Sequence, residues 1–184
     1  MTEYYPDVMV DIETTGLEPD RSAILQIGAV KFNLKERTVD PKVFDQSLSM
    51  PNFRHWDMGT RHWWAQKPPS IMQDIQARSQ PYKTVMENFQ QWSLPSGSLK
   101  FWAKPTHFDF MFISSYFRDC DLVNPFSYRD AEDMNSFIRG RYFPEKPDSS
   151  IEKNTKIDGP AHNALNDCFW QLKVLFAHCD KLGI

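Results

Sequence analysis

The sequence predicts an α/β domain with a mixed sheet, because extended segments come first and helices then alternate with a further strand. Segments 7–13, 23–32 and 38–48 are joined by short turns, which favours an antiparallel meander. Segment 99–103 has a strand pattern and follows a helix, and a crossover of this kind usually produces parallel pairing.

The elements follow from apolar spacing and from proline and glycine positions. The first strand contains the apolar run Val8-Met9-Val10 and ends in a Thr-Thr-Gly turn. The third is weaker, and Pro41 places it at an edge or a bulge. The predicted helices cover 54–66, 71–77, a segment opened by Pro81, 107–117, 131–139 and 161–181. A turn is expected at 95–98, a short strand at 126–129 and a long loop at 140–159.

Length and composition indicate one domain, residues 1–184. The chain has 184 residues, 41% apolar and 24% charged, without a repeat or a linker. Its apolar runs are too short to cross a membrane, and its start lacks the pattern of a secretory signal. Cys168 and Cys179 would lie roughly 16 Å apart on one helix, too far for a disulfide. We therefore expect reduced thiols and a cytoplasmic protein.

The net charge of −3 and the pI near 5.9 argue against a protein that coats nucleic acid in general. An enzyme that buries acids around metal ions and grips a short stretch of strand remains compatible with this charge.

Asp11 and Glu13 stand two residues apart at the end of the first strand, so they share one face. Two carboxylates this close repel each other unless a cation lies between them. A divalent metal is the obvious cation, and a solvated strand end is the alternative. Further acids and a histidine at suitable places decide between the two.

Three such residues occur later in the chain. Asp109 lies in the first turn of an apolar helix, where the helix dipole also favours an acid. Asp167 follows His162 by five residues, about 140° on a regular helix, so we place His162 on the loop before the helix. A capping or surface histidine is the alternative for His162.

These motifs resemble those of the DEDDh 3′→5′ exonucleases: D-I-E-T-T-G, then F-D, then H-x-x-x-x-D. The resemblance implies a ribonuclease H-like fold, a five-stranded mixed sheet with three antiparallel strands first, flanked by helices. It implies two Mg²⁺ or Mn²⁺ ions held by Asp11, Glu13, Asp109 and Asp167, with His162 as general base. The products would be nucleoside 5′-monophosphates.

Within that superfamily the chain looks most similar to the phage exonuclease A and RNase AS branch. The branch carries a W-W-x-x-Q-x-P-like helix and an R-D pair, which here are Trp63-Trp64-Ala65-Gln66-Lys67-Pro68 and Arg129-Asp130. The glutamine and proline are one position closer to the tryptophans here. The second block opens with Lys104-Pro105 instead of a small residue or Asn, which leaves the strand placement near Asp109 open.

The resemblance also implies contacts to the 3′ end of a nucleic acid. The candidate substrate-binding residues are Thr14, Thr15, Leu17, His62, Trp64, Phe108 and Arg129. Each also has an ordinary structural interpretation: the tryptophans as core anchors, Leu17 as a plain turn residue, and Arg129 in a structural ion pair. Lys146, Lys153 and Lys156 lie in the long loop, where they either touch phosphates or are simply solvated.

We expect a two-metal exonuclease that acts on single-stranded or frayed 3′ ends. DNA is the favoured substrate because the short chain looks like a phage protein, which would place it in the host cytoplasm. An exoribonuclease is the alternative. The remaining candidates are a non-catalytic nucleic-acid-binding relative and a proofreading-type subunit with a partner. The aromatics around Trp56, Trp63 and Trp64 are a candidate homodimer interface.

Overall fold

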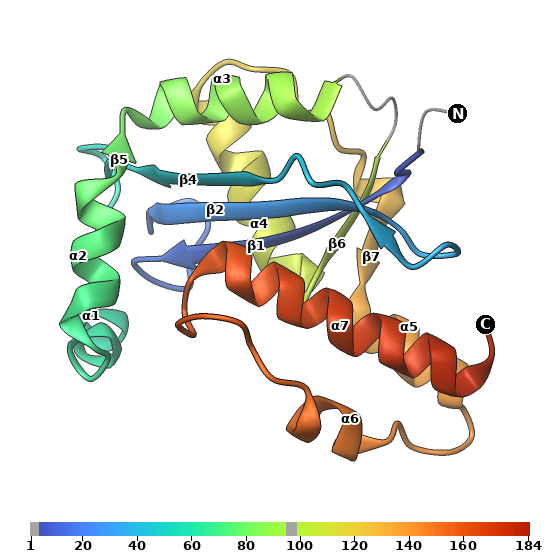
Figure 1. Ribbon diagram of the computed structural model, residues 1–184. Helices are drawn as coiled ribbons and strands as arrows, with labels where there is room; N and C mark the ends of the chain where they lie inside the picture. Colours follow the sequence, from blue (N-terminus) through green and yellow to red (C-terminus); the bar gives the residue numbers. More distant parts are fainter. Residues whose placement is uncertain (1–3, 95–98) are drawn as a thin grey trace.

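The computed structural model describes residues 4–94 and 99–184, so the turn expected at 95–98 lies outside the described residues. A central sheet carries helices on both of its faces (Figure 1). Its order is β5-β4-β2-β1-β6-β7, with β3 paired to β2. The strands are β1 (Asp7–Thr14), β2 (Ile24–Asn33), β3 (Thr38–Val39), β4 (Phe44–Leu48), β5 (Ser79–Gln80), β6 (Lys100–Ala103) and β7 (Ala131–Asp133).

The pairing confirms a mixed α/β sheet with antiparallel strands first. β1 pairs antiparallel with β2, and β2 with β4, whereas β6 lies parallel to β1 and β7 parallel to β6. The described residues form seven strands where five were expected, because one expected strand is divided in two and the two-residue strand β5 is an addition.

The expected strand 38–48 is divided into β3 and β4. The chain between them turns at Pro41, whose carbonyl accepts the Val43 N–H at 3.2 Å. Because proline has no N–H to donate to a ladder, strand pairing stops at this point.

The helices form layers on the two faces of the sheet. They are α1 (Met58–Ala65), α2 (Pro69–Ala77), α3 (Tyr82–Ser93), α4 (Thr106–Asp119), α5 (Met134–Tyr142), α6 (Ser149–Asn154) and α7 (Ala164–Leu182), with a 3₁₀ turn, η2 (Tyr128–Asp130). α3 and α4 cover one face, α5 and α7 cover the other, and α1 and α2 lie at one end (Figure 1).

Alternate residues of β1 face different layers. Val8 and Val10 pack in the core beneath α3 and α4, while Met9 packs in the core beneath α5 and α7. By the same alternation, Asp11 and Glu13 face the layer that contains α7.

The segment 126–139 is placed differently from the sequence-based expectation. The expected strand at 126–129 is wrong, because 128–130 form the 3₁₀ turn and 131–133 form β7 beside β6. The helix expected from 131 begins at Met134, where the Asp133 carboxylate accepts the Ser136 N–H at 2.8 Å. This N-cap fixes the helix start three residues later.

The last part of the chain also shows two differences. The loop expected at 140–159 contains the short helix α6, capped by Asp148 through the Ser150 N–H at 2.9 Å. The final helix begins at Ala164 and not at 161, because Asn163 is its N-cap and His162 has a φ of +61°. A left-handed residue cannot continue into a right-handed helix, so His162 stays on the preceding loop, as expected.

α7, with 19 residues, is the longest of the described helices. Among the described residues no helix combines the length and the apolarity that a membrane crossing requires.

Candidate active site

Asp11, Glu13 and Asp167 form a compact group of carboxylates. Asp11 and Glu13 lie near the end of β1, and Asp167 lies in the first turn of α7. One oxygen from each carboxylate lies within 4.8 Å of the others. A pair that the sequence placed on one strand is therefore joined by an acid from the other end of the chain.

Asp109 reaches the same end of β1 from the opposite layer. It lies in the first turn of α4, is only 4% exposed, and accepts the Ile12 N–H on Oδ1 at 3.2 Å. Ile12 separates Asp11 from Glu13, so the structure brings all four predicted acids to one strand end.

The close approach of α7 to the sheet depends on Gly28. Gly28 pairs with Asp11, and a Cβ added to it would lie 2.3 Å from the Ala164 carbonyl carbon and 2.4 Å from the Leu165 nitrogen. The Cys168 thiol lies 3.3 Å from the Gly28 carbonyl oxygen. Only a residue without a side chain lets α7 begin this close to β2.

Two buried glutamines tie α7 to the strands. Gln26 is fully buried and accepts the Ala164 N–H on Oε1 at 3.1 Å, while its Nε2 donates to Asp45 at 2.7 Å. Gln171 lies one turn after Asp167 and donates from Nε2 to Asp11 Oδ1 at 2.7 Å. Its Oε1 is buried without a hydrogen-bond partner among the described residues.

Burial raises the pKa of every acid in the group, and repulsion by the neighbouring acids adds to this rise for Asp11 and Glu13. Desolvation, then Asp167 and Asp109, raise the pKa of Glu13 to about 8. Burial raises the pKa of Asp109 to about 8 and that of Asp167 to about 6. The pKa of Asp11 is raised well above its usual range by desolvation first, and then by Asp109, Glu13 and Asp167.

This donor set fits a divalent cation. None of the four acids forms an ion pair with a Lys, Arg or His in the described part of the chain. Hard cations such as Mg²⁺ and Mn²⁺ prefer carboxylate oxygens, and a bound cation would offset the repulsion that raises these pKa values.

His162 lies on the loop before α7, where its backbone N–H hydrogen-bonds to Asp167. Its ring packs edge-on against Trp63, with centroids 4.8 Å apart and planes at 77°. Burial and then Lys67 lower the pKa of His162 below its usual value. The imidazole is therefore neutral at neutral pH and can accept a proton.

A pocket of about 430 Å³ adjoins Glu13. Its lining residues are Ile12, Glu13, Thr14, Leu17, Asp57, Gly59, Thr60, Trp63, Trp64 and Phe108. Leu17 is 73% exposed and Trp63 is 38% exposed, so two large apolar side chains stand at its mouth. The pocket is next to the carboxylates and has an aromatic wall, as a site for a base requires.

The other predicted contact residues differ in their placement. The Thr15 N–H donates to the Ala23 carbonyl at 2.8 Å and its hydroxyl to the His55 carbonyl at 2.7 Å, so both groups are used inside the fold. Trp64 lines the pocket but is 7% exposed, and its indole N–H donates to the Thr14 carbonyl at 3.0 Å.

Two predicted contact residues are not brought to the acids. His62 is exposed on α1 and does not line the pocket. Arg129 lies in the 3₁₀ turn before β7, and β7 is parallel to β6, which in turn is parallel to β1. It is therefore near the strand starts, whereas Asp11 and Glu13 are near the end of β1.

Sequence reasoning missed the supporting residues Gln26, Gly28 and Gln171, and its candidate substrate-binding residues included Trp64 but not Trp63. A glycine within an otherwise apolar strand was the available signal for Gly28, because it often marks a close backbone approach. The glutamines carried no local signal.

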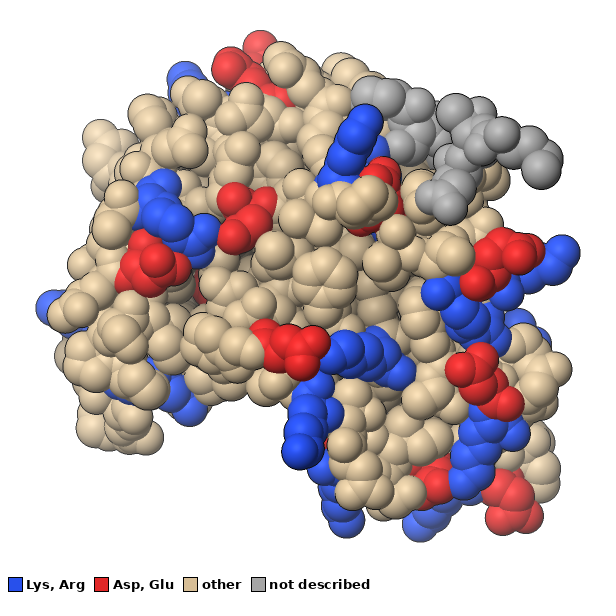
Figure 2. All heavy atoms as spheres, viewed as in Figure 1, with Lys and Arg blue, Asp and Glu red and all other residues tan. Residues whose placement is uncertain are grey.

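Lysines, arginines and acids lie in mixed groups on the face seen in Figure 2. No continuous basic surface is visible on that face, which agrees with a local grip on a short stretch of substrate.

Comparison with known proteins supports the fold and the family. Residues 6–178 match the family described as the 3′-5′ exoribonuclease Rv2179c-like domain. A comparison with curated protein sequences finds no match.

Solved structures of exonuclease I are among those similar to this chain. The zinc-bound complex of E. coli exonuclease I with single-stranded DNA has a TM-score of 0.71 at 17% identity, covering 98% of this chain and 42% of that one. The complex of E. coli exonuclease I with a dA16 oligonucleotide has a TM-score of 0.69 at 16% identity, covering 95% and 41%. A product-bound exonuclease I has a TM-score of 0.68 at 15% identity, covering 98% and 45%.

The chain thus spans less than half the length of these structures. At such sequence identities the likeness shows the fold alone, and it confirms the fold that the sequence predicted. The family match extends over nearly the whole chain and includes every acid of the group and His162. The chain therefore belongs to the 3′-5′ exoribonuclease Rv2179c-like domain family and is a 3′-5′ exonuclease domain.

Proposed function

We propose that this chain removes nucleoside 5′-monophosphates one at a time from the 3′ end of single-stranded nucleic acid, with two divalent metal ions. The observation that carries the proposal is the approach of Asp11, Glu13 and Asp167 within 4.8 Å, beside a pocket with an aromatic wall. The matched exonuclease I structures include complexes with single-stranded DNA and with a dA16 oligonucleotide, which supports a single-stranded substrate here.

The four acids are the proposed metal ligands. Asp11, Glu13 and Asp167 form the compact group, and Asp109 completes it from the α4 side. Two ions held there would supply an activated water and would stabilise the leaving 3′ oxygen. Mg²⁺ and Mn²⁺ are the proposed ions, because all four donors are carboxylates.

His162 is the proposed general base. A neutral imidazole can take the proton of the attacking water, and the lowered pKa of His162 keeps the ring neutral over a wider pH range. The edge contact with Trp63 holds the ring on the side of the pocket.

Leu17, Phe108 and Trp63 are the proposed contacts for the terminal base. All three line the pocket, and two of them are aromatic. Thr14 also lines the pocket, and Trp64 supports Thr14 through the hydrogen bond to its carbonyl. We infer that Thr15, whose N–H and hydroxyl are both occupied, shapes the turn and does not touch substrate.

The sugar preference is the finer part of the proposal. The sequence alone favoured DNA, and the matched exonuclease I structures contain single-stranded DNA. The family description, an exoribonuclease domain, favours RNA as a second candidate substrate. Reading a 2′-hydroxyl needs only one or two contacts, so both substrates belong in the test.

The test uses 5′-labelled single-stranded DNA, single-stranded RNA and double-stranded DNA, each with Mg²⁺, with Mn²⁺ and with EDTA. We expect a ladder that shortens from the 3′ end, mononucleotide products, and no reaction in EDTA. Asp11→Asn keeps the side-chain volume and should abolish the ladder, while Asp20→Asn, at an exposed position, should leave it unchanged. Undiminished hydrolysis by Asp11→Asn would exclude the metal assignment.

A homodimer and a partner such as a polymerase remain proposals. Exposed Trp63 and Met58 are candidate contacts for a second copy. Hydrolysis by the isolated chain would exclude strict dependence on a partner, and sedimentation equilibrium would give the number of copies.

A further inference from the structure

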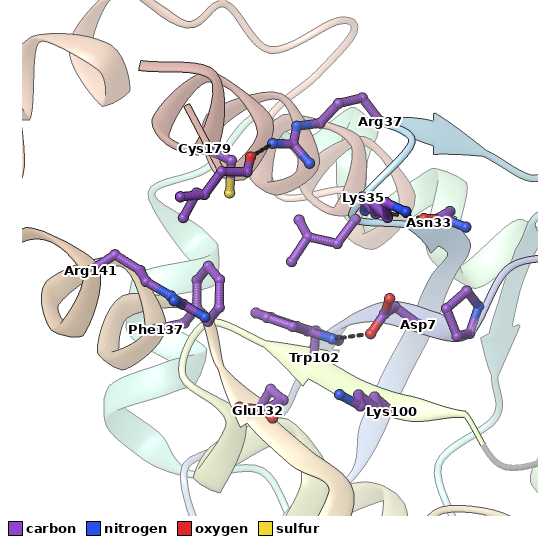
Figure 3. A pocket seen from close by; sticks show the side chains of 13 residues that line it. Asp7, Asn33, Lys35, Arg37, Lys100, Trp102, Glu132, Phe137, Arg141 and Cys179 are labelled. Atoms are coloured by element: carbon purple, nitrogen blue, oxygen red, sulfur yellow. Dashed lines mark hydrogen bonds between the residues drawn. The ribbon is translucent and has the colours of Figure 1, made fainter. Parts of the chain in front are cut away.

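A second cavity lies at the other end of β1 from the acids (Figure 3). Its volume is about 570 Å³, within the range of small-molecule sites. Its lining residues are Pro6, Asp7, Asn33, Leu34, Lys35, Arg37, Lys100, Trp102, Glu132, Phe137, Arg141, Cys179 and Ile184. Asp7 precedes Asp11 by four residues of strand, about 13 Å, so this cavity is separate from the proposed active site.

Aromatic rings form one wall of this rear cavity. Trp102 is 3% exposed, and its ring meets that of Phe137 edge-on, with centroids 5.1 Å apart at 75°. Leu34 and Cys179 add further apolar surface. A wall of this kind favours a planar, largely apolar group.

A buried carboxylate faces the same space. Asp7 is 6% exposed, accepts the Trp102 indole N–H at 2.9 Å, and forms no ion pair with a described side chain. Burial raises the pKa of Asp7, while the Trp102 hydrogen bond, the charge of Lys100 and a hydrogen bond from the Leu34 backbone oppose that rise. A carboxylate oxygen has two lone pairs, so Asp7 can accept a further N–H from a ligand.

Exposed cations surround the opening. Lys35, Lys100 and Arg141 form no ion pair with any residue in the described ranges, whereas Arg37 pairs with Asp180. The Arg141 guanidinium lies 4.9 Å from the centre of the Phe137 ring. Glu132 is the only other acid that lines the described cavity, so cations outnumber acids there.

The aromatic wall, the buried carboxylate and the exposed cations together restrict the class of ligand that the rear cavity can bind. A purely apolar molecule would not use three cations that lack ion-pair partners, and a small inorganic anion would not use the aromatic wall. A base with amino or imino donors, joined to a phosphate, uses the wall, the Asp7 acceptor and the cations together.

We propose that the rear cavity binds a nucleoside 5′-monophosphate, with its base against Trp102 and donating to Asp7, and with its phosphate on Lys100 or Arg141. Such molecules are the products of the proposed reaction, and in that respect the inference rests on the proposed function. Binding itself needs no catalysis, so the two proposals can fail separately.

The test is an NMR titration of the metal-free protein in EDTA that follows the six tryptophan indole N–H signals. The probes are guanosine 5′-monophosphate, guanosine and inorganic phosphate. Guanine offers two adjacent N–H donors to a carboxylate. Trp102→Phe identifies the Trp102 signal, and the Trp63 and Trp64 signals report on the proposed active site in the same spectrum.

We expect the monophosphate to shift the Trp102 signal saturably and more tightly than guanosine or phosphate does. The double variant Lys100→Glu and Arg141→Glu should weaken this binding by at least about tenfold, since a charge-assisted hydrogen bond is lost. The matched control, Lys83→Glu with Arg139→Glu, makes the same charge change at exposed sites outside the cavity and should bind normally. An unmoved Trp102 signal, or equal binding by the two double variants, would overturn the proposal.

Discussion

Gln171 holds Asp11 by a direct hydrogen bond of 2.7 Å. Burial and three acidic neighbours together raise the pKa of Asp11. Its carboxylate therefore needs a hydrogen-bond donor that keeps it in one orientation. Gln171 is 3% exposed and has no other described partner for Nε2. At the residue scale, this contact orients a proposed metal ligand from the adjacent helix.

We therefore predict that Gln171→Leu weakens Mn²⁺ binding or activity by about 10- to 100-fold, the usual effect of removing such a support. The fold should persist, because leucine fills a similar volume at this position of α7. Mn²⁺ affinity from EPR titration and circular dichroism are the two measurements. Gln76→Leu, at an exposed position on α2, is the matched control. Wild-type Mn²⁺ affinity in Gln171→Leu would contradict a positioning role.

Trp63 is the second residue whose role can be tested. It is 38% exposed, contacts the His162 ring and lines the pocket. We predict that Trp63→Ala raises KM and also shifts the acid limb of the pH–rate profile, because His162 loses a desolvating neighbour and its pKa returns upward. An unchanged pH profile would show that Trp63 serves substrate binding alone.

At the scale of elements, the position of α7 decides whether the site exists. Asp167 lies on α7, whose first residue, Ala164, is bonded to Gln26 and lies against Gly28. The opposite wall depends on the segment before α1. There the buried Arg54 donates to the Ser22 carbonyl at 3.0 Å and to the Ser115 hydroxyl at 3.1 Å, and it pairs with Asp119. These contacts fasten the chain that leads into α1 to the segment before β2 and to α4.

Gly28→Ala should push the start of α7 away from β2. A Cβ there would meet backbone atoms at 2.3 Å, and backbone cannot move aside cheaply, so we expect a loss of about 1–3 kcal/mol of stability. Activity should fall by more than the loss of folded protein explains, because Asp167 moves with the helix. Urea unfolding and the exonuclease assay measure the two effects.

Gly140→Ala is the control for that substitution. Gly140 lies in α5, and a Cβ added there would meet nothing within 4 Å. Alanine should be neutral or stabilising by up to about 1 kcal/mol at a helical site. Equal losses of stability and activity in Gly28→Ala and Gly140→Ala would show that the close approach of α7 to β2 does not cause them.

At the scale of the whole molecule, the acid group links stability to pH. In the folded chain Glu13 and Asp109 hold protons up to about pH 8 and Asp167 up to about pH 6, while the unfolded chain releases them near their ordinary values. Between the pKa values of the unfolded chain and those of the folded chain, the folded state therefore binds more protons than the unfolded state. The free energy of unfolding falls as pH rises through this range.

We predict that the melting temperature in EDTA falls between about pH 5 and about pH 8, and that Glu13→Gln makes this fall smaller. Added Mg²⁺ or Mn²⁺ should restore more stability at the higher pH, because metal binding requires ionised carboxylates. Thermal unfolding monitored by circular dichroism gives both results, with Asp20→Asn as the control. A melting temperature that falls more steeply with pH in Glu13→Gln than in the wild type would refute the linkage.

Local sequence patterns were sufficient to predict much of the fold and the candidate site of this protein. The alternation along β1 determined that Asp11 and Glu13 share a face, and helical spacing determined that α4 and α7 are amphipathic. Three short motifs were enough to propose the four acids and His162 as site residues, because each motif occupies a short stretch of chain. Boundaries were less certain where a single cap decides them, as at Asp133 and Asn163.

Tertiary structure alone decided which distant groups meet. Gln26, Gly28 and Gln171 act through contacts across more than a hundred residues of chain, and no local pattern reveals such partners. The same reason explains why Trp63 and not His62 faces the pocket, and why Arg129 lies near the strand starts, away from the acids. A sequence specifies the chemical groups of a site, whereas the packing of helices on a sheet sets their distances.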